Sequence, residues 1–394
     1  MVSMQIAIIH NYRSDTMKGI FTYILIFVIT CWMFISLLIN HQRQQIDFIA
    51  VGDNLIHPVV YQDANNGKDS YNFQKMYRPI APYIQDKDLA YINQESPLGG
   101  DDRPFSGFKR FNTPSVVAKA VIDTGFNLIN GSNNHSLDQG TSGINNSLST
   151  WHKYQDKALF TGMFKSKDDY NKTPTINIKN TKVSMLSYTF GTNNLTPKLP
   201  YQIKYINKKQ IKRDIKKAKQ HSDFIVISMH WGKEGSHKPS KKQKEYAKFL
   251  AKQNVDVVIG MHPHVIQPVE WVKGTQNHKT LVAYSLGNFL NGQETGTESN
   301  HLGGSIQFKI ANNHNDTKIS DVKWRSIVNH YEMTAPYNDD SRHHFKVYML
   351  NDYPNKLANQ HGLQYQRNAN ISKSQLQQIT TNVIDKRFLD NNSY

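Results

Sequence analysis

The sequence predicts an α/β fold, and three observations indicate this class. Short β-branched runs alternate with amphipathic helical stretches along most of the chain. Many of these runs are followed at once by clusters of polar residues. At 394 residues, the chain is long enough to bury a substantial core in one large domain with additions. Strands that alternate with helices are typical of sheets that carry their site at the carboxyl ends of the strands.

The expected elements follow from the spacing of the apolar residues. Apolar runs predict strands at 46–51, 88–93, 126–130, 182–188, 223–229, 255–259, 281–284 and 305–310. Apolar residues that recur on one face predict helices at 113–125, 208–219 and 240–253. In the first of these helices Thr113 is a good N-cap, Pro114 suits the first helical position, and Gly125 can end the helix.

A charge-free stretch near the amino end predicts a membrane anchor. Residues 20–39, IFTYILIFVITCWMFISLLI, contain no charged side chain. About twenty apolar residues in a helix span the hydrocarbon core of a bilayer. No small-residue cleavage site follows, which argues against a cleaved signal peptide. We therefore expect one N-terminal transmembrane signal anchor at 20–39, a main domain at 45–312 and a partly irregular C-terminal extension at 313–394.

The charges beside this stretch predict its orientation. Arg13 and Lys18 precede it together with one acidic residue, Asp15, and Arg43 follows it. This bias favours a cytoplasmic amino end. Residues 1–19 are thus expected to be a short cytoplasmic tail of a single-pass cell-membrane protein, with the main domain extracellular.

The chain is strongly basic, which restricts its partners. Lys and Arg number 47 against 31 Asp and Glu, so the formal net charge is +16. Such a surface attracts polyanions. For an external domain we expect anionic envelope polymers or lipid head groups, and no nucleic acid. The single cysteine, Cys31, lies in the expected anchor, so the main domain can form neither a disulfide nor a cysteine-based zinc site.

Polar residues at the expected strand ends are candidates for one shared site. His262 and His264 follow the strand at 255–259, and in an extended segment residues two apart point the same way. The remaining candidates at strand ends are Asp53, Glu95, Asn134, His135 and His230. Two carboxylates, one Asn and three histidines suit a pair of divalent ions such as Mn, Fe or Zn. His135 would remain as a general acid.

The order of these motifs resembles a known family. The motifs GDNLIH, NQES, NNHSLDQG, MHWGKE, GMHPHVIQPVE and YSLGNF, between about residues 47 and 290, are similar to those of the CapA proteins of poly-γ-glutamate capsule biosynthesis. That family in turn resembles calcineurin-like metallophosphoesterases. The resemblance implies a four-layer β-sandwich flanked by helices, poly-γ-glutamate or a related anionic polymer as partner, and other membrane subunits of a capsule synthase.

The resemblance also implies roles for the site residues. Asp53 and His264 would bind a first metal ion and Glu95 would bridge to a second. The second ion would be held by Asn134, His230 and His262, with His135 and Glu234 as catalytic candidates. Phosphoesterases usually begin with Asp-x-His, whereas this chain has Asp53-Asn54-Leu55. The additional candidate ligands are His57, Asn93 and Asn288.

The sequence leaves three functions open. One is a metal-dependent hydrolase or transferase of capsule assembly, acting on an amide, an ester or a phosphoester. The second is a non-catalytic scaffold or transport subunit of the synthase, in which the anchor and the lysines matter. The third is a glycosidase-like site that uses Glu95 and Glu234 as an acid/base pair.

Overall fold

The computed structural model describes residues 20–36, 45–68, 70–293, 297–312, 317–366 and 370–394. The chain divides into two compact units, Met1–Gln45 and Ile46–Tyr394. In the first unit residues 20–36 form a helix with exposed apolar side chains. Residues 37–39 of the expected anchor and the expected tail, 1–19, lie outside the described residues. Within the described ranges, no helix combines the length and the apolar character that crossing a membrane requires.

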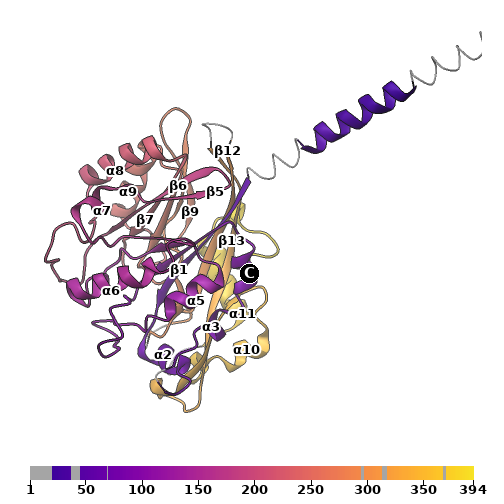
Figure 1. The fold of residues 1–394 in the computed structure, drawn as a ribbon. Coiled ribbons are helices and arrows are strands. Elements are labelled where there is room, and N and C mark those ends of the chain that lie inside the picture. Colours follow the sequence, from indigo (N-terminus) through magenta and orange to yellow (C-terminus); the bar gives the residue numbers. More distant parts are fainter. Residues whose placement is uncertain (1–19, 37–44, 69, 294–296, 313–316, 367–369) are drawn as a thin grey trace, which may run out of the picture. The chain divides into compact units, whose positions relative to one another are not determined.

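The second unit is a mixed α/β domain with two sheets, as expected (Figure 1). The first sheet is ordered β14-β13-β12-β1-β2-β3-β4, with β11 also paired to β1, and the second is ordered β5-β6-β7-β8-β10-β9. The strands of the first sheet are β1 (Gln45–Leu55), β2 (Leu89–Gln94), β3 (Leu128–Asn130), β4 (Leu159–Thr161), β11 (Asn288–Asn291), β12 (Leu302–Asn312), β13 (Thr317–Met333) and β14 (Arg342–Met349). Those of the second are β5 (Thr175–Ile178), β6 (Thr181–Thr189), β7 (Phe224–His230), β8 (Val257–Met261), β9 (Val269–Lys273) and β10 (Lys279–Ala283).

The main hydrophobic core lies between the two sheets. Phe48 and Tyr91 from the first sheet belong to the same buried cluster as Val226 and Ile259 from the second. Alternate residues of a strand face opposite sides, so the other face of each sheet needs its own cover. The residues on those outer faces, such as Ile49 in β1, form separate clusters with helices.

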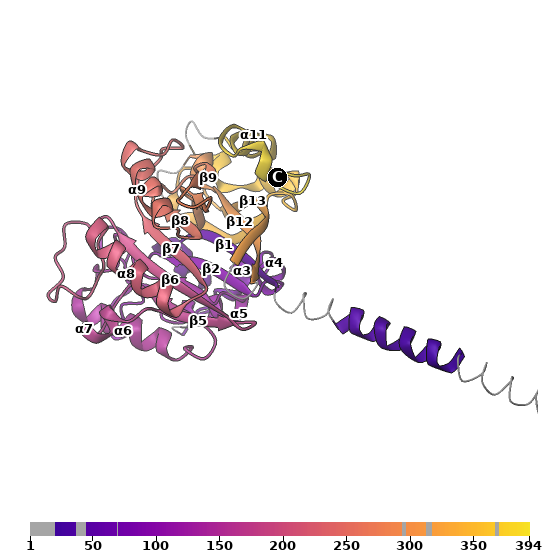
Figure 2. The ribbon, with the colours of Figure 1, turned by 90° about the horizontal axis from the view of Figure 1, so that it is seen from above.

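Helices cover both outer faces. The described helices are α2 (Pro58–Ala64), α3 (Gln74–Tyr77), α4 (Ala81–Gln85), α5 (Val117–Thr124), α6 (Gly140–His152), α7 (Lys167–Asn171), α8 (Lys208–His221), α9 (Lys241–Lys252), α10 (Asn355–Gln360) and α11 (Lys373–Val383). Helices α2 to α5 pack on the first sheet, and α8 and α9 pack on the second. Figure 2 shows α8 and α9 outside the strands β6 to β8. The order helix, sheet, sheet, helix gives four layers.

One expected helix begins later than its sequence signals suggest. Helix α5 starts at Val117 instead of Thr113, although Gly125 ends it as expected with φ 108°. The Asp101 carboxylate accepts a hydrogen bond of 2.9 Å from the Ser115 amide, and the Thr113 amide donates to the Pro97 carbonyl. These contacts hold the segment before α5 against the preceding loop, so Thr113 does not act as the N-cap of the helix.

The residues of the expected C-terminal extension are built into the domain. From 317 onwards they supply β13 and β14 to the first sheet. Leu363, Leu376 and Phe388, from the segments that follow, join the core between the sheets. The sequence pattern fades here because half of β13 is exposed or only partly buried, which weakens its apolar signal.

Gly52 lets β1 approach the connection between β10 and β11. A Cβ atom at Gly52 would lie 1.9 Å from the carbonyl oxygen of Gly287. The next residue, Asp53, donates its amide to that same carbonyl at 2.9 Å. The absence of a side chain at Gly52 therefore sets the position of Asp53.

We expect Gly52→Ala to destabilise the protein by about 1–3 kcal/mol or more, because backbone must move to admit the methyl group. Urea unfolding of the full chain measures this change. Gly191→Ala is the control, since a Cβ atom there meets nothing within 4 Å. Equal stability of the two variants would contradict this account.

Candidate metal centre

The carboxyl ends of the parallel strands bring the candidate residues together. In the first sheet Asp53 pairs with Asn93, and Asn93 pairs with Asn130. In the second sheet His230 pairs with Met261, the residue before His262. The first sheet thus delivers oxygen donors and the second delivers imidazoles to the same end of the sandwich.

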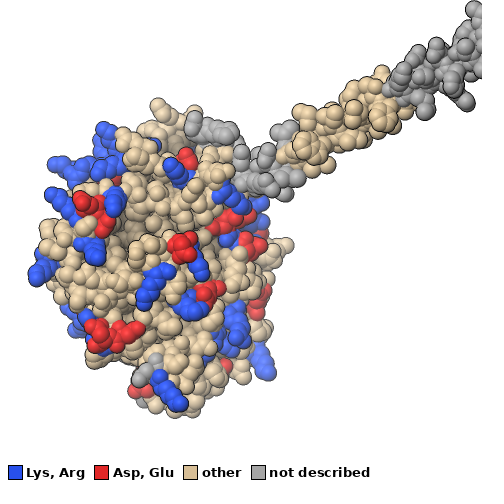
Figure 3. All heavy atoms as spheres, viewed as in Figure 1, with Lys and Arg blue, Asp and Glu red and all other residues tan. Residues whose placement is uncertain are grey.

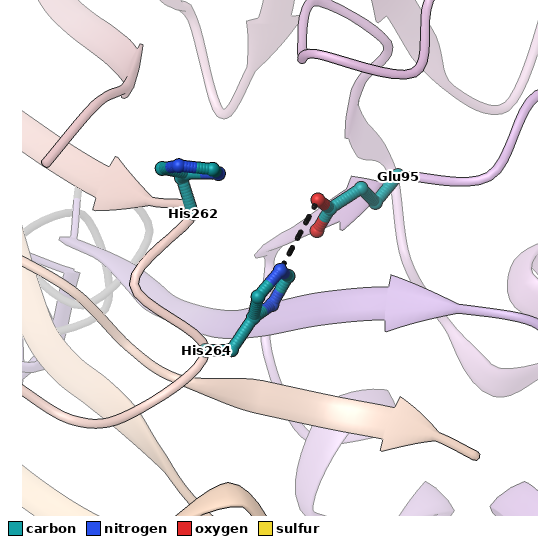
Figure 4. A group of neighbouring side chains, drawn as sticks. All are labelled: Glu95, His262 and His264. Atoms are coloured by element: carbon teal, nitrogen blue, oxygen red, sulfur yellow. Dashed lines mark ion pairs between the residues drawn. The ribbon is translucent and has the colours of Figure 1, made fainter. Parts of the chain in front are cut away.

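Glu95 lies at the middle of the cluster. Its Oε1 atom is 3.5 Å from His230 Nε2 and 3.7 Å from His264 Nε2. Figure 4 shows His264 and Glu95 pointing toward each other, with His262 beside them. Two groups of possible ligands share Glu95: one is completed by His262 and His264, the other by Asp53 and His230. A carboxylate in both groups has the position of a bridge between two ions.

Asp53 is held by partners on both of its oxygens. Oδ1 accepts a hydrogen bond of 2.7 Å from the Asn93 amide, and Oδ2 lies 3.1 Å from His264 Nδ1. The His262 backbone amide donates to Oδ2 at 3.4 Å. The same Nδ1 of His264 lies 3.0 Å from the Asn288 side-chain oxygen. Asn93 and Asn288 therefore orient Asp53 and His264.

Asn134 and Glu234 occupy different depths. Asn134 Oδ1 lies 2.9 Å from His230 Nε2, inside the cluster. Glu234 Oε1 lies 3.9 Å from His262 Nε2, but the Glu234 side chain is 62% exposed. Asn134 thus belongs to the buried donor set, whereas Glu234 stands at its rim.

His135 is oriented by a carboxylate that sequence analysis did not single out. Its Nδ1 lies 2.7 Å from Asp138 Oδ2, and both side chains are buried. The Phe111 ring packs edge-on against His135 at 4.7 Å and against His57 at 5.1 Å. The sequence feature that could have revealed Asp138 is its position three residues after His135, within the motif NNHSLDQG.

His57 is bound to backbone near the cluster. Its Nδ1 lies 3.0 Å from the Leu55 carbonyl oxygen and 3.1 Å from the Gly292 amide. It belongs to none of the ligand groups found among the described residues.

The histidine loop reaches the cluster by a different conformation from the one expected. His262 and His264 have φ values of 99° and 57°, so the loop is not an extended strand end. The rings still lie 5.8 Å apart between centroids. Left-handed backbone at non-glycine residues costs free energy and is concentrated at functional sites.

Phe190 is a further residue that the sequence did not reveal. Its ring lies 4.6 Å from that of His262 and 6.2 Å from that of His230, and Phe190 is 49% exposed. It follows β6, and only its place after an expected strand could have suggested it. It forms an aromatic wall at the opening of the cluster.

The electrostatics of the cluster favour a bound cation. Burial and the Asp53 carboxylate raise the pKa of Glu95 well above its usual value. Burial lowers the pKa of His262 to about 3 and lowers that of His230 as well. Burial also acts to lower the pKa of His264, but the carboxylates of Glu95 and Asp53 outweigh it and raise this pKa to about 10. A proton is therefore retained between Glu95 and His264 at neutral pH.

Unpaired atoms show that the donor set fits metal ions. Glu95 Oε1, His230 Nδ1 and His262 Nδ1 are buried and have no hydrogen-bond partner within the described residues. Leaving such groups unpaired is costly. Imidazole and carboxylate donors without thiolate suit Mn, Fe or Zn. The residues present can thus hold divalent cations.

Fold and site together define a class: an α/β sandwich with a buried set of oxygen and nitrogen donors at its strand ends. The chain belongs to the family described as bacterial capsule synthesis protein PGA_cap, whose model matches residues 47–293. This match confirms the family that the motifs suggested.

Two named relatives carry similar descriptions. The chain is 26% identical over 297 residues to the capsule biosynthesis protein CapA of Bacillus anthracis, covering 72% of this chain and 68% of that protein. It is 26% identical over 224 residues to the PGA biosynthesis protein CapA of Bacillus subtilis (strain 168), covering 55% of this chain and 56% of that protein.

The solved structures that match this chain have lower sequence identity to it than the two named relatives. A 5'-nucleotidase precursor from Thermus thermophilus has a TM-score of 0.45 and 11% identity, and the match covers 72% of this chain but only 54% of that one. The calcineurin-like phosphoesterase YfkN from Bacillus subtilis has a TM-score of 0.42 and 14% identity, covering 72% of this chain and 90% of that one.

We expect Glu95→Gln to weaken metal binding at least about tenfold, because it removes the charge shared by both ligand groups. Metal analysis of the full chain, purified in detergent and dialysed against Mn²⁺, Fe²⁺ or Zn²⁺, measures this. Asp86→Asn is the control, since the Asp86 side chain is 76% exposed. Unchanged metal content in Asp53→Ala, His230→Ala and His264→Ala would exclude the dinuclear centre.

Metal binding should also depend on pH. His264, whose pKa is raised to about 10, must lose its proton before it can act as a ligand, so affinity should rise with pH up to about pH 10. The rise is about tenfold per pH unit for each proton displaced. Titration calorimetry in buffers of different ionisation enthalpy counts the protons released. The control is His152→Ala, an exposed residue; an affinity independent of pH would contradict the assignment.

Proposed function

We propose that this chain is a membrane-anchored protein of poly-γ-glutamate capsule formation with a metal-dependent, hydrolase-like centre in an extracellular domain. The observation that carries the proposal is the position of Glu95, shared by two groups of buried ligands in a chain of the capsule synthesis family. Both named relatives are described as biosynthesis proteins, one of capsule and one of PGA.

The chemistry follows from the residues around the centre. Bound divalent ions would lower the pKa of water and polarise an ester, amide or phosphoryl oxygen. Asp53, Glu95 and the histidines would hold these ions, and Asn134 lies 2.9 Å from His230 Nε2. Asp138 binds Nδ1 of His135, so the other ring nitrogen is the one that can pass a proton to a leaving group.

The basic surface supports an anionic polymer as partner. A shallow groove beside α8 is lined by Lys209, Lys212, Arg213, Lys216 and Lys219. In Figure 3 Lys and Arg side chains gather over α8 at the upper left. A carboxylate polymer would gain favourable contacts along such a row, and the gain would fall with rising salt.

The membrane anchor is proposed from residues 20–39. This run has no charge, and the large apolar side chains of its described part are exposed, for example Phe21 at 73% and Trp32 at 70%. An exposed apolar surface of this extent marks a site that contacts another protein or a membrane, and we propose the lipid bilayer. Arg13 and Lys18 support a cytoplasmic amino end.

A second candidate function is a non-catalytic subunit that holds the synthase together or passes the polymer outward. The depth of the donor set favours it, because Asp53, Glu95 and His230 are fully buried. A polymer approaching from outside would meet the rim first, at Glu234 and Phe190. The glycosidase-like alternative is weaker, since Glu95 lies among imidazoles instead of facing Glu234 alone.

Capsule measurement in cells separates the two candidates. With His135→Ala at normal protein level, we expect polymer output to fall by about two orders of magnitude or more if His135 is a general acid. His152→Ala is the matched control. Normal capsule with His135→Ala, but none after deletion of residues 20–39, would establish the scaffold role instead. Activity that resists chelators would favour the glycosidase-like pair.

A further inference from the structure

A second cluster of metal-binding residues lies where β13 pairs with β14, apart from the centre described above. Glu332 on β13 and His343 and His344 on β14 offer ligand atoms that all lie within 4.8 Å of one another. None of these residues belongs to the first donor set. The family motifs end before them, because the family match stops at residue 293.

A β-bulge brings the two neighbouring histidines together. Glu332 pairs with His343, and the register shifts between His330 and Glu332. His344 takes a left-handed conformation with φ 55°. In a regular strand adjacent side chains point to opposite faces, but here the two rings stack with centroids 4.3 Å apart. The backbone irregularity thus creates the juxtaposition.

The spacing of the donor atoms matches a tetrahedral ion. His344 Nδ1 lies 3.3 Å from Glu332 Oε2, and His330 Nε2 lies 3.6 Å from Glu332 Oε1. Ligands bound to tetrahedral zinc at about 2.0–2.1 Å lie roughly 3.3 Å from each other. The carboxylate therefore has an imidazole beside each of its oxygens at a suitable distance.

Two buried ring nitrogens without hydrogen-bond partners, those of His330 and His343, lie at or beside the cluster. The His330 side chain is 1% exposed, and its Nδ1 lies 2.7 Å from the Tyr353 hydroxyl. That bond turns Nε2 toward Glu332, where Nε2 is buried without a hydrogen-bond partner among the described residues. His343 Nδ1 is likewise buried and unpartnered there. His330 is not a member of the ligand group, so the unpartnered Nδ1 of His343, which is a member, is the observation that points to an ion.

We propose that Glu332, His343 and His344 form a second site for a divalent transition-metal ion of the zinc type, with the buried His330 beside it. Two imidazoles and one carboxylate, with the fourth position left to water, suit Zn²⁺, and Cu²⁺ and Ni²⁺ bind the same donors. The ion fastens the edge strand β14 to β13. Lys75, a charged neighbour of His343, is engaged with Asp63.

The experiment uses the full chain with the first centre silenced by Glu95→Gln. Equilibrium dialysis against Zn²⁺ after chelator treatment should show one remaining saturable site, and Co²⁺ should give visible absorption typical of tetrahedral coordination. Adding Glu332→Gln, or His343→Ala with His344→Ala, should weaken that site at least about tenfold. Adding His152→Ala should leave it unchanged.

Two results would overturn the proposal: no saturable Zn²⁺ in the Glu95→Gln chain, or equal affinity after the substitutions at Glu332 or at the two histidines. Glu332 and His344 side chains are 28% and 61% exposed, so their substitution leaves the core intact. If Glu95→Gln does not fold, Glu332→Gln and the double variant His343→Ala with His344→Ala are each compared with the unsubstituted chain. Each variant must then bind one equivalent of zinc less than that chain.

Discussion

Two carboxylates, Asp53 and Glu95, are fully buried side by side, and the arrangement around them follows from this constraint. Taking one ionised carboxylate out of water costs several kcal/mol, and about as much again for the second. Amide and imidazole donors surround both groups, and His264 lies against each of them. Even so, one oxygen of Glu95 and one nitrogen each of His230 and His262 have no hydrogen-bond partner among the described residues. Divalent ions bound at Glu95 would give its unpaired oxygen a partner and offset the buried negative charge.

The two sheets contribute different halves of this site. Asp53, Glu95 and Asn134 follow strands of the first sheet, whereas His230 and the histidine loop follow strands of the second. The site therefore exists only when the sheets pack face to face. Core contacts between the sheets, such as those of Phe48 and Tyr91 with Val226 and Ile259, position ligands that lie some distance from them. A substitution in this core would act on the centre through the relative placement of the sheets.

Much of the fold was predictable because strands and helices leave local patterns. Buried strands such as β7 and β8 are mostly apolar, and Ser240 caps the amino end of α9 in a capping box, as its sequence indicates. The predicted start of α5 was wrong because a hydrogen bond to Asp101 holds the segment that follows Thr113, the expected N-cap, outside the helix. The convergence of His262 and His264 was predicted, but for a wrong reason, since positive φ values and not an extended strand bring them to the cluster.

The sequence by itself determined the α/β class, the strand ends that carry polar donors, and the family, because these depend on local periodicity and on short motifs. Only the tertiary structure decided which donors share Glu95, that Asp138 orients His135, and that Phe190 stands at the opening. It also placed Glu332 beside two histidines through a bulge. Most of these contacts join residues far apart in the chain or depend on a shift of register, and the spacing of residues along one segment does not show them. His135 and Asp138 are only three residues apart, but the sequence does not tell which polar neighbour the folded loop brings to the ring.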